Sequence, residues 1–185
     1  EIIPVEGWKR IQMFDQTGLL WTNPSPNMRS LTQAILYPGV GLIEMTNVSV
    51  GRGTETPFEV VGAPWIEARR FAAHLNNAGL NGVRFVPVSF VPGSSKYTNE
   101  TCNGVNIIIT DRAKFHPLST GTQLMCSLKA LYNEEWDRKN VNRLLCSGKT
   151  IEAVEAGRSV NDIEPLWAED LARFLNRRRR FLRYE

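Results

Sequence analysis

Residues 44–54 carry the side chains in this sequence that are best suited to bind a sugar. They supply a carboxylate at Glu44, an amide at Asn47, a guanidinium at Arg52 and a hydroxyl at Thr54, together with two glycines. Sugar hydroxyls pair well with planar amide, carboxylate and guanidinium groups. In open α/β sheets, the loops at the carboxyl ends of strands converge on ligands. The segment therefore indicates a carbohydrate site.

A structural interpretation of the same residues carries equal weight. Glu44 and Arg52 have opposite charges and could form an ion pair that only holds the loop together. Asn27 lies in the turn-rich segment Asn23-Pro24-Ser25-Pro26-Asn27. Its amide could line the same cleft, or bond its own turn, which is the commoner use of asparagine in turns.

Other kinds of active site lack their signatures in this sequence. His74 and His116 are its two histidines, and neither accompanies a cysteine or aspartate cluster, so we expect no metal. A Gly-x-Ser-x-Gly motif is absent, which argues against a serine hydrolase triad. Gly51-Arg52-Gly53 lacks the third glycine and the following helix of a dinucleotide fingerprint. We therefore expect no cofactor.

The elements around residues 44–54 indicate part of an α/β sheet. A short helix is predicted from its N-cap Ser30 to Tyr37, because Pro38-Gly39 should end it. Residues 40–43 have the pattern of a short buried strand that ends at Glu44. A helix, a strand and a polar loop in this order are typical of α/β proteins.

A change in sequence character between residues 57 and 65 marks a domain boundary, which we place at residue 62. The remainder alternates helices and strands as an α+β domain would. Helices are predicted over residues 66–78, 118–132 and 151–156, and strands over 83–91 and 104–111. Pro87 indicates an edge position for the first of these strands.

A last helix is predicted from Ser159, which forms a capping box with Asp162. Its apolar stripe consists of Ile163, Trp167, Leu171, Phe174 and Phe181. Residues 177–180 are four arginines, and without them the net charge of +3 would be close to zero. The sequence therefore lacks the pervasive basic character of a nucleic-acid partner. It also lacks an apolar run of about 18 residues, so no membrane span is expected.

The three cysteines, Cys102, Cys126 and Cys146, are widely spaced. An odd number without a Cys-x-x-Cys pair argues against a zinc site and against a disulfide framework. Buried free thiols are the favoured interpretation, and one disulfide with a spare thiol is the alternative.

Several motifs taken together resemble one bacterial family. In chain order they are Asn23-Pro24-Ser25-Pro26-Asn27, Tyr37-Pro38-Gly39, residues 44–54, Gly62-Ala63-Pro64-Trp65, Cys102-Asn103-Gly104-Val105, Thr110-Asp111-Arg112 and Phe181-Leu182-Arg183-Tyr184. By their order and spacing, nearly the whole chain resembles the exo-β-N-acetylmuramidases of the NamZ type, formerly a domain of unknown function. One departure is Met45, where the family more often has a glycine; a methionine could stiffen the loop beside Glu44.

The resemblance implies a fold and a substrate. Residues 1–62 would be the C-terminal part of a Rossmann-like catalytic domain, and residues 63–185 an α+β ancillary domain, with the active site in the cleft between the two. The partner of this chain would be the missing N-terminal half of the same protein. The family releases N-acetylmuramic acid from the non-reducing ends of peptidoglycan, so peptidoglycan fragments or muropeptide sugars are the implied substrates. A periplasmic or secreted location is expected.

Site roles follow from this family chemistry. Glycoside hydrolysis usually needs two carboxyl groups, although a 2-acetamido sugar can replace one with its own carbonyl oxygen. The family's usual catalytic glutamate would lie upstream of this chain, and we predict Glu44 as the carboxylate that this chain contributes. The predicted substrate-binding residues are Asn27, Asn47, Arg52 and Thr54. Arg52 is also suited to grip the lactyl carboxylate of muramic acid. The rival hypothesis is a non-catalytic glycan-binding or interaction module.

Overall fold

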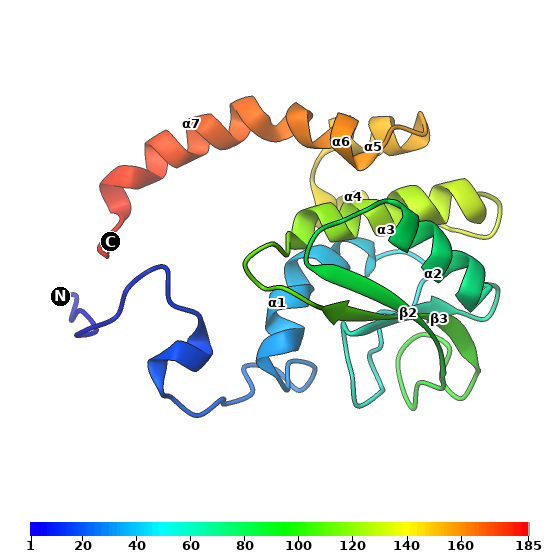
Figure 1. Ribbon diagram of the computed structural model, residues 1–185, viewed down its shortest axis with the longest axis horizontal. Helices are drawn as coiled ribbons and strands as arrows, with labels where there is room; N and C mark the ends of the chain where they lie inside the picture. Colours follow the sequence, from blue (N-terminus) through cyan, green and yellow to red (C-terminus); the bar gives the residue numbers. More distant parts are fainter. Residues whose placement is uncertain (185) are drawn as a thin grey trace.

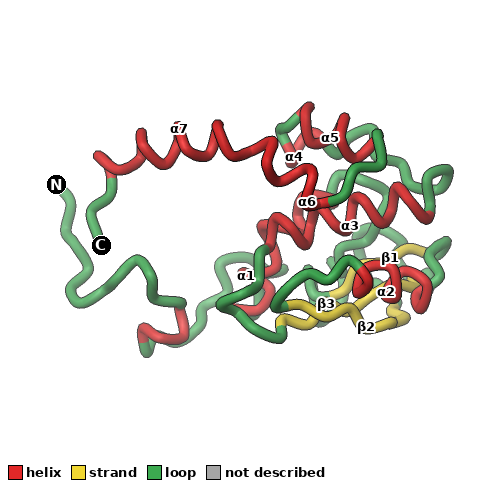
Figure 2. Tube along the Cα trace, turned by 45° about the horizontal axis from the view of Figure 1, so that its top comes forward, coloured by secondary structure: helices red, strands yellow, loops and turns green. Residues whose placement is uncertain are grey.

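A three-stranded antiparallel sheet forms one layer of the protein, and helices cover one of its faces (Figures 1 and 2). The computed structural model describes residues 1–184. Strand β3, Cys102–Ile109, lies in the middle, with β1, Val60–Ala63, on one side and β2, Val83–Phe90, on the other. The mixture of helices with a small sheet is consistent with the predicted α/β class.

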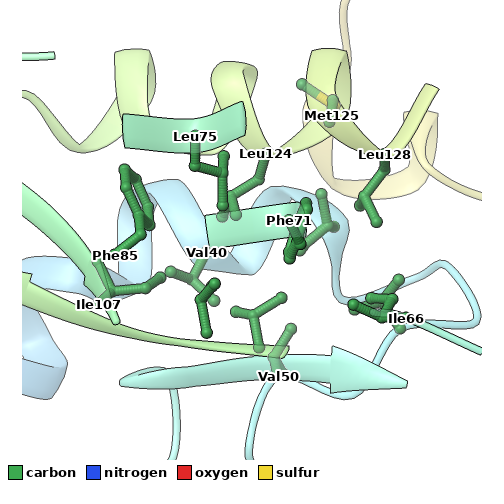
Figure 3. Close-up of a cluster of buried hydrophobic side chains, with 14 of the residues drawn as sticks. Val40, Val50, Ile66, Phe71, Leu75, Phe85, Ile107, Leu124, Met125 and Leu128 are labelled. Carbon is green, nitrogen blue, oxygen red and sulfur yellow. The ribbon is translucent and has the colours of Figure 1, made fainter. Parts of the chain in front are cut away.

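The core lies between this sheet and the helices. Helix α2, Ala68–Asn77, packs on β2 and β3, and helix α3, Pro117–Leu131, packs on α2 and on α1, Leu31–Val40. Figure 3 shows the apolar side chains that these elements and the loops beside them direct toward one another. The labelled residues are Val40, Val50, Ile66, Phe71, Leu75, Phe85, Ile107, Leu124, Met125 and Leu128.

The predicted strand over residues 40–43 is wrong. Helix α1 begins at the predicted N-cap, where the Ser30 side chain accepts a hydrogen bond from the Gln33 amide, but it passes through Pro38. A 3₁₀ turn, Gly41–Ile43, follows directly. Leu36, Val40 and Ile43 are fully buried, and their spacing of four and three residues is helical. A short apolar run looks the same in a buried helix and in a buried strand.

Helices α1 and α3 cross at a pair of glycines. A Cβ atom added to Gly39 would overlap the Pro117 carbonyl oxygen, and one added to Gly121 would overlap the Gly39 carbonyl oxygen. The two backbones can therefore approach this closely only because neither position has a side chain. The glycine that was expected to end the first helix instead lets it cross α3.

The elements predicted after residue 65 are confirmed, with small shifts at their ends. Helices α2, α3 and α5, Gly148–Glu155, occur where the sequence indicates them. Strand β2 carries Pro87 and is an edge strand, as predicted. Strand β1 lies in the segment interpreted as a domain boundary, and the short helix α4, Asn142–Leu145, was also missed.

The predicted last helix is interrupted. Helix α6, Val160–Ile163, has the expected capping box between Ser159 and Asp162. A 3₁₀ turn, Glu164–Trp167, then separates it from helix α7, Ala168–Arg178, and a further 3₁₀ turn, Arg179–Phe181, follows. Pro165 lies in the first of these turns, where its lack of an N–H group removes a helical hydrogen bond.

Two extended segments project from the body of the molecule (Figure 1). We call residues 1–30 the N-terminal arm, which contains one 3₁₀ turn, Phe14–Thr17, and residues 164–184 the C-terminal arm. Their ends meet: the Val5 amide donates to the Tyr184 hydroxyl oxygen at 2.8 Å, and the rings of Trp8 and Tyr184 pack edge to face. Within residues 1–184, no helix combines the length and apolar character that crossing a membrane requires.

All three cysteines are free thiols, as the favoured interpretation expected. Their burial differs from that expectation, however. Cys102 is buried, Cys126 is partly covered, and Cys146 is exposed at the end of α4.

Candidate functional site

Two loops pack against each other at one end of the sheet. One connects the 3₁₀ turn after α1 to β1 (loop 44–59), and the other connects β2 to β3 (loop 91–101). The Gly93 amide donates to the Gly53 carbonyl oxygen at 2.8 Å. Gly53 has a φ of +83°, and a Cβ atom there would lie 2.6 Å from the Ser94 nitrogen. A residue with a side chain would therefore both be strained and push the loops apart.

Backbone strain is concentrated in these loops. Within residues 1–184, the non-glycine residues with positive φ are Phe58, Ser95, Tyr97, Asn99 and Cys146. All but Cys146 belong to the two loops. Each such residue costs on the order of 1–3 kcal/mol unless the surrounding structure supports it, and such residues cluster at functional sites.

Glu44 and Arg52 form an ion pair, as the structural interpretation allowed. The Arg52 Nε donates to the Glu44 carboxylate, and the guanidinium also stacks over the Phe58 ring, 5.1 Å from its centre. The Glu44 side chain is 13% exposed and the Arg52 side chain 31%. The charge of Arg52 is therefore already matched within this chain.

Lys96, in loop 91–101, lies beside this pair. Its Nζ donates to the main-chain oxygen of Glu44. Burial lowers the pKa of Lys96; the nearby Glu44 carboxylate opposes this effect and Arg52 adds to it. Lys96 was not among the site residues predicted from the sequence.

Asn47 is the predicted site residue with the most hydrogen bonds. Its Nδ2 donates to the Glu135 carbonyl oxygen and its Oδ1 accepts from the Asp137 amide, both at 2.8 Å. Its own carbonyl oxygen accepts from the Tyr97 hydroxyl at 2.6 Å. Asn47 therefore ties loop 44–59 both to loop 91–101 and to the segment that follows α3.

Thr54 and Asn27 take part in local turns. The Thr54 hydroxyl donates to the Gly51 carbonyl oxygen at 2.7 Å and accepts from the Thr56 amide at 3.1 Å. The main-chain N–H of Asn27 donates to the Ser25 hydroxyl oxygen at 3.4 Å. These contacts are the local turn bonds that threonine and serine hydroxyls commonly make.

A cavity of roughly 360 Å³ opens where Asn47, Lys96 and Tyr97 meet the segment after α3. Its lining consists of Met45, Thr46, Asn47, Lys96, Tyr97, Asp137 and Asn140. Of the five residues predicted from sequence, Asn47 lines this cavity. The other four do not border it within the described residues. A lysine and a tyrosine directly after the turn Pro92-Gly93-Ser94-Ser95 are the signal that could have drawn attention to loop 91–101.

Tyr97 is held from two sides. Its hydroxyl accepts from the Trp65 indole at 3.2 Å and donates to Asn47. Burial raises the pKa of Tyr97, which keeps the hydroxyl protonated near neutral pH. One wall of the cavity is therefore rigid.

A larger cavity, roughly 630 Å³, also borders Asp137 but is less suited to a charged ligand. Of the two cations that line it, Arg138 is paired with the Glu155 carboxylate, which Lys129 also contacts at 3.0 Å, and Lys139 is exposed to solvent. Among residues 1–184, the larger cavity therefore offers no partly buried cation that lacks a carboxylate partner, so the smaller cavity is the better candidate.

Comparison with known proteins agrees with the resemblance seen in the sequence. Residues 35–184 match the family model described as "Exo-beta-N-acetylmuramidase NamZ, C-terminal", and residues 1–32 match the corresponding N-terminal model. The chain is 37% identical over 186 residues to the peptidoglycan beta-N-acetylmuramidase NamZ of Bacillus subtilis (strain 168). This alignment covers 99% of this chain and 45% of that protein.

Two crystal structures of DUF1343 family proteins from Bacteroides fragilis NCTC 9343 are also similar. One has a TM-score of 0.79 and 26% identity, covering 97% of this chain and 49% of its own. The other has a TM-score of 0.64 and 25% identity, covering 88% and 44%. The chain spans about half the length of the relatives it matches.

The match to the N-terminal family model ends at residue 32, and the match to the C-terminal model begins at residue 35. Both positions are nearer the start of the chain than the domain boundary predicted at residue 62. In the structure, α1 packs on α3, and β1 pairs with β3. The boundary at residue 62 stays a prediction.

Proposed function

The chain belongs to the NamZ family of exo-β-N-acetylmuramidases, and from this premise we propose that it is part of a peptidoglycan-degrading glycoside hydrolase. The enzyme would release N-acetylmuramic acid from the non-reducing ends of peptidoglycan fragments. The observation that carries the proposal is the 37% identity, along 99% of the chain, with a protein named as a peptidoglycan beta-N-acetylmuramidase. Because peptidoglycan lies outside the cytoplasmic membrane, we propose a periplasmic or secreted location.

We propose that the rest of a Rossmann-like N-terminal domain covers the two arms. Residues 1–32 match the N-terminal family model, so the N-terminal arm belongs with that domain. Both arms expose large apolar side chains that this chain leaves uncovered, among them Ile11, Leu20, Leu171 and Phe181. Exposed apolar surface of this extent is typical of an interface.

We propose that the two loops form one wall of the active site. Glu44 is the carboxylate that this chain supplies, and Arg52 orients it. A second carboxyl group would come from the N-terminal domain, or be replaced by the acetamido oxygen of the sugar. Asn47 supports this wall by joining its loop to Glu135, Asp137 and Tyr97.

Hydrolysis of two chromogenic substrates by the full-length protein tests the proposal. We expect cleavage of a β-N-acetylmuraminide, with the matching β-N-acetylglucosaminide cleaved at least tenfold less efficiently, since a charge-assisted contact contributes about this much. The 185-residue chain alone should cleave neither substrate. If the full-length protein left the muraminide intact, or cleaved both equally, the proposed function would be wrong.

A further inference from the structure

Lys96 has hydrogen-bonding capacity at the smaller cavity that the chain does not use. A lysine ammonium carries three N–H donors. Within residues 1–184, Nζ donates to the Glu44 main-chain oxygen, and no carboxylate forms an ion pair with it. Lys96 also lines the cavity. The ammonium therefore lies beside an open space with donors to spare.

The other partly buried cations nearby are paired, which makes Lys96 different. Arg52 pairs with Glu44, and Lys129 and Arg138 share Glu155. The Glu44 carboxylate favours the charged form of Lys96 through its charge but does not contact the ammonium, and burial still lowers the pKa of Lys96. Holding a partly buried ammonium without a contacting carboxylate is unfavourable, because burial penalises the charged form. A lysine with a purely structural role would be expected to have a carboxylate partner, as these cations do.

The backbone around Lys96 is fixed before any ligand binds. Its neighbours Ser95 and Tyr97 both have positive φ, and Tyr97 is anchored by Trp65 and Asn47. A binding group held by a strained and well-supported backbone loses little entropy when it contacts a ligand. The loop therefore holds the main chain of Lys96 in place, and the bond from Nζ to the Glu44 main-chain oxygen positions the ammonium.

The rest of the lining fits a hydroxylated ligand. Asn140 offers an amide and Asp137 a carboxylate, and both border the cavity with Lys96. Amides and carboxylates bind sugar hydroxyl and acetamido groups, whereas an ammonium binds a carboxylate. At roughly 360 Å³, the volume lies near the lower end of the range usual for small-molecule sites and suits one sugar unit.

We propose that this cavity binds the carboxylate-bearing sugar, with Lys96 contacting its carboxylate and Asp137 and Asn140 contacting its polar groups. This inference rests on the proposed function, and it assigns selection of muramic acid over glucosamine to Lys96. The sequence suggested Arg52 for that role, but its guanidinium is held by Glu44.

Substitution of Lys96 in the full-length protein tests the inference. Lys96→Met should lower kcat/KM on the muraminide roughly ten- to hundredfold, mainly through KM, and leave kcat/KM on the glucosaminide within about threefold. Lys96→Arg should recover part of the loss, because it restores the charge with a different shape. Lys129→Met, which removes a partly buried lysine that is already paired with Glu155, is the matched control and should leave the preference unchanged.

A binding measurement separates this inference from the proposed function. Calorimetry should show the wild-type protein binding N-acetylmuramic acid at least tenfold more tightly than N-acetylglucosamine, and Lys96→Gln should abolish the difference. If the wild type cleaves neither substrate but this difference in binding holds, the proposed function fails and the inference stands. If the wild type prefers the muraminide and all three Lys96 variants keep that preference, the inference is overturned.

Discussion

The body of the molecule and its two arms use the same kinds of apolar residue in opposite ways. In the body, Phe71 and Leu124 are fully buried within one cluster. In the N-terminal arm, Ile11 is 88% exposed and Leu20 is 91% exposed. In the C-terminal arm, Phe181 is also exposed. Figure 1 shows why: the body folds back on itself, whereas the arms extend away from it and meet only at their tips.

An apolar stripe in a sequence therefore predicts burial without identifying the surface that buries it. The stripe from Ile163 to Phe181 has helical spacing throughout. Ile163, at its start, is buried against the body, whereas Leu171 and Phe174 are about half exposed. We attribute the uncovered part to contact with the N-terminal domain proposed above.

The largest expected effect comes from truncating one phenylalanine in each region. In the 185-residue chain, Phe71→Ala should lower the free energy of unfolding by about 3–5 kcal/mol, because it opens a cavity in the core. Phe174→Ala should change it by less than about 0.5 kcal/mol, because the ring is about half exposed and lies outside the core. Urea unfolding measures both. The same Phe174→Ala change should cost more in the full-length protein, and equal costs there and in the short chain would contradict the proposed domain contact.

A smaller effect is expected where the two loops meet. Gly53→Ala should destabilise the chain by about 1–3 kcal/mol, because alanine is strained at a φ of +83° and would press on Ser94. Gly148→Ala is the control. Gly148 is the first residue of α5, its φ is not in the positive range, and its Cβ would meet no neighbour within 4 Å. There alanine should be neutral or stabilising by less than about 1 kcal/mol. Thermal unfolding of both variants tests this, and similar losses would mean that the loop contact contributes little.

Breaking the Glu44–Arg52 pair should affect stability more than substrate choice. Arg52→Ala leaves a mostly buried carboxylate without its partner, which costs about 1–3 kcal/mol. Arg29→Ala breaks an exposed pair with Glu55 and should cost less than about 1 kcal/mol. In the full-length protein, the preference for muraminide over glucosaminide should survive Arg52→Ala. A lost preference with an unchanged Tm would instead support the role that the sequence suggested for Arg52.

The smallest expected effect is a change in the free energy of unfolding with pH in the acidic range. The hydrogen bond from Arg138, helped by Lys129, lowers the pKa of Glu155 from its ordinary 4.5 to about 2. Because the folded pKa is the lower one, this stabilisation is complete above about pH 4.5 and is lost as the pH falls toward 2. Solvent screening keeps it modest, since the carboxylate is partly exposed.

Glu155→Gln should therefore flatten the stability profile between pH 4.5 and pH 2, as measured by urea unfolding at a series of pH values. Glu169→Gln, on the exposed side of α7, should leave the profile unchanged. Matching profiles for the two variants would argue against the Glu155 network.

The parts of the fold that were predicted correctly depend on local signals. The Ser30 cap of α1 and the capping box of Ser159 and Asp162 could be predicted, because each of these contacts joins residues only three positions apart in the sequence. Pro87 indicates an edge strand because proline has no backbone N–H to donate to a neighbouring strand. The error at residues 40–43 arose where local signals conflict, since a proline and a glycine inside a helix look like its end.

The candidate site was harder to predict because distant segments build it. The pairing of Glu44 with Arg52 was one of two alternatives open from the sequence. Lys96 and Asp137 reach the cavity only because loop 91–101 and the segment after α3 pack on Asn47. Tyr97 and Asn47 are 50 positions apart in the chain, and Asp137 and Asn47 are 90 apart. No local pattern encodes such contacts.

The unequal burial of the three thiols supplies an attachment point for a spectroscopic probe. Burial raises the pKa of Cys102 and of Cys126 to about 11, which suppresses their reactive thiolate forms near neutral pH. Cys146 is exposed and belongs to the body. A maleimide dye should therefore attach there first, and one further cysteine in either arm would complete a fluorophore pair. Energy transfer between the two dyes would then report directly how far each arm moves relative to the body.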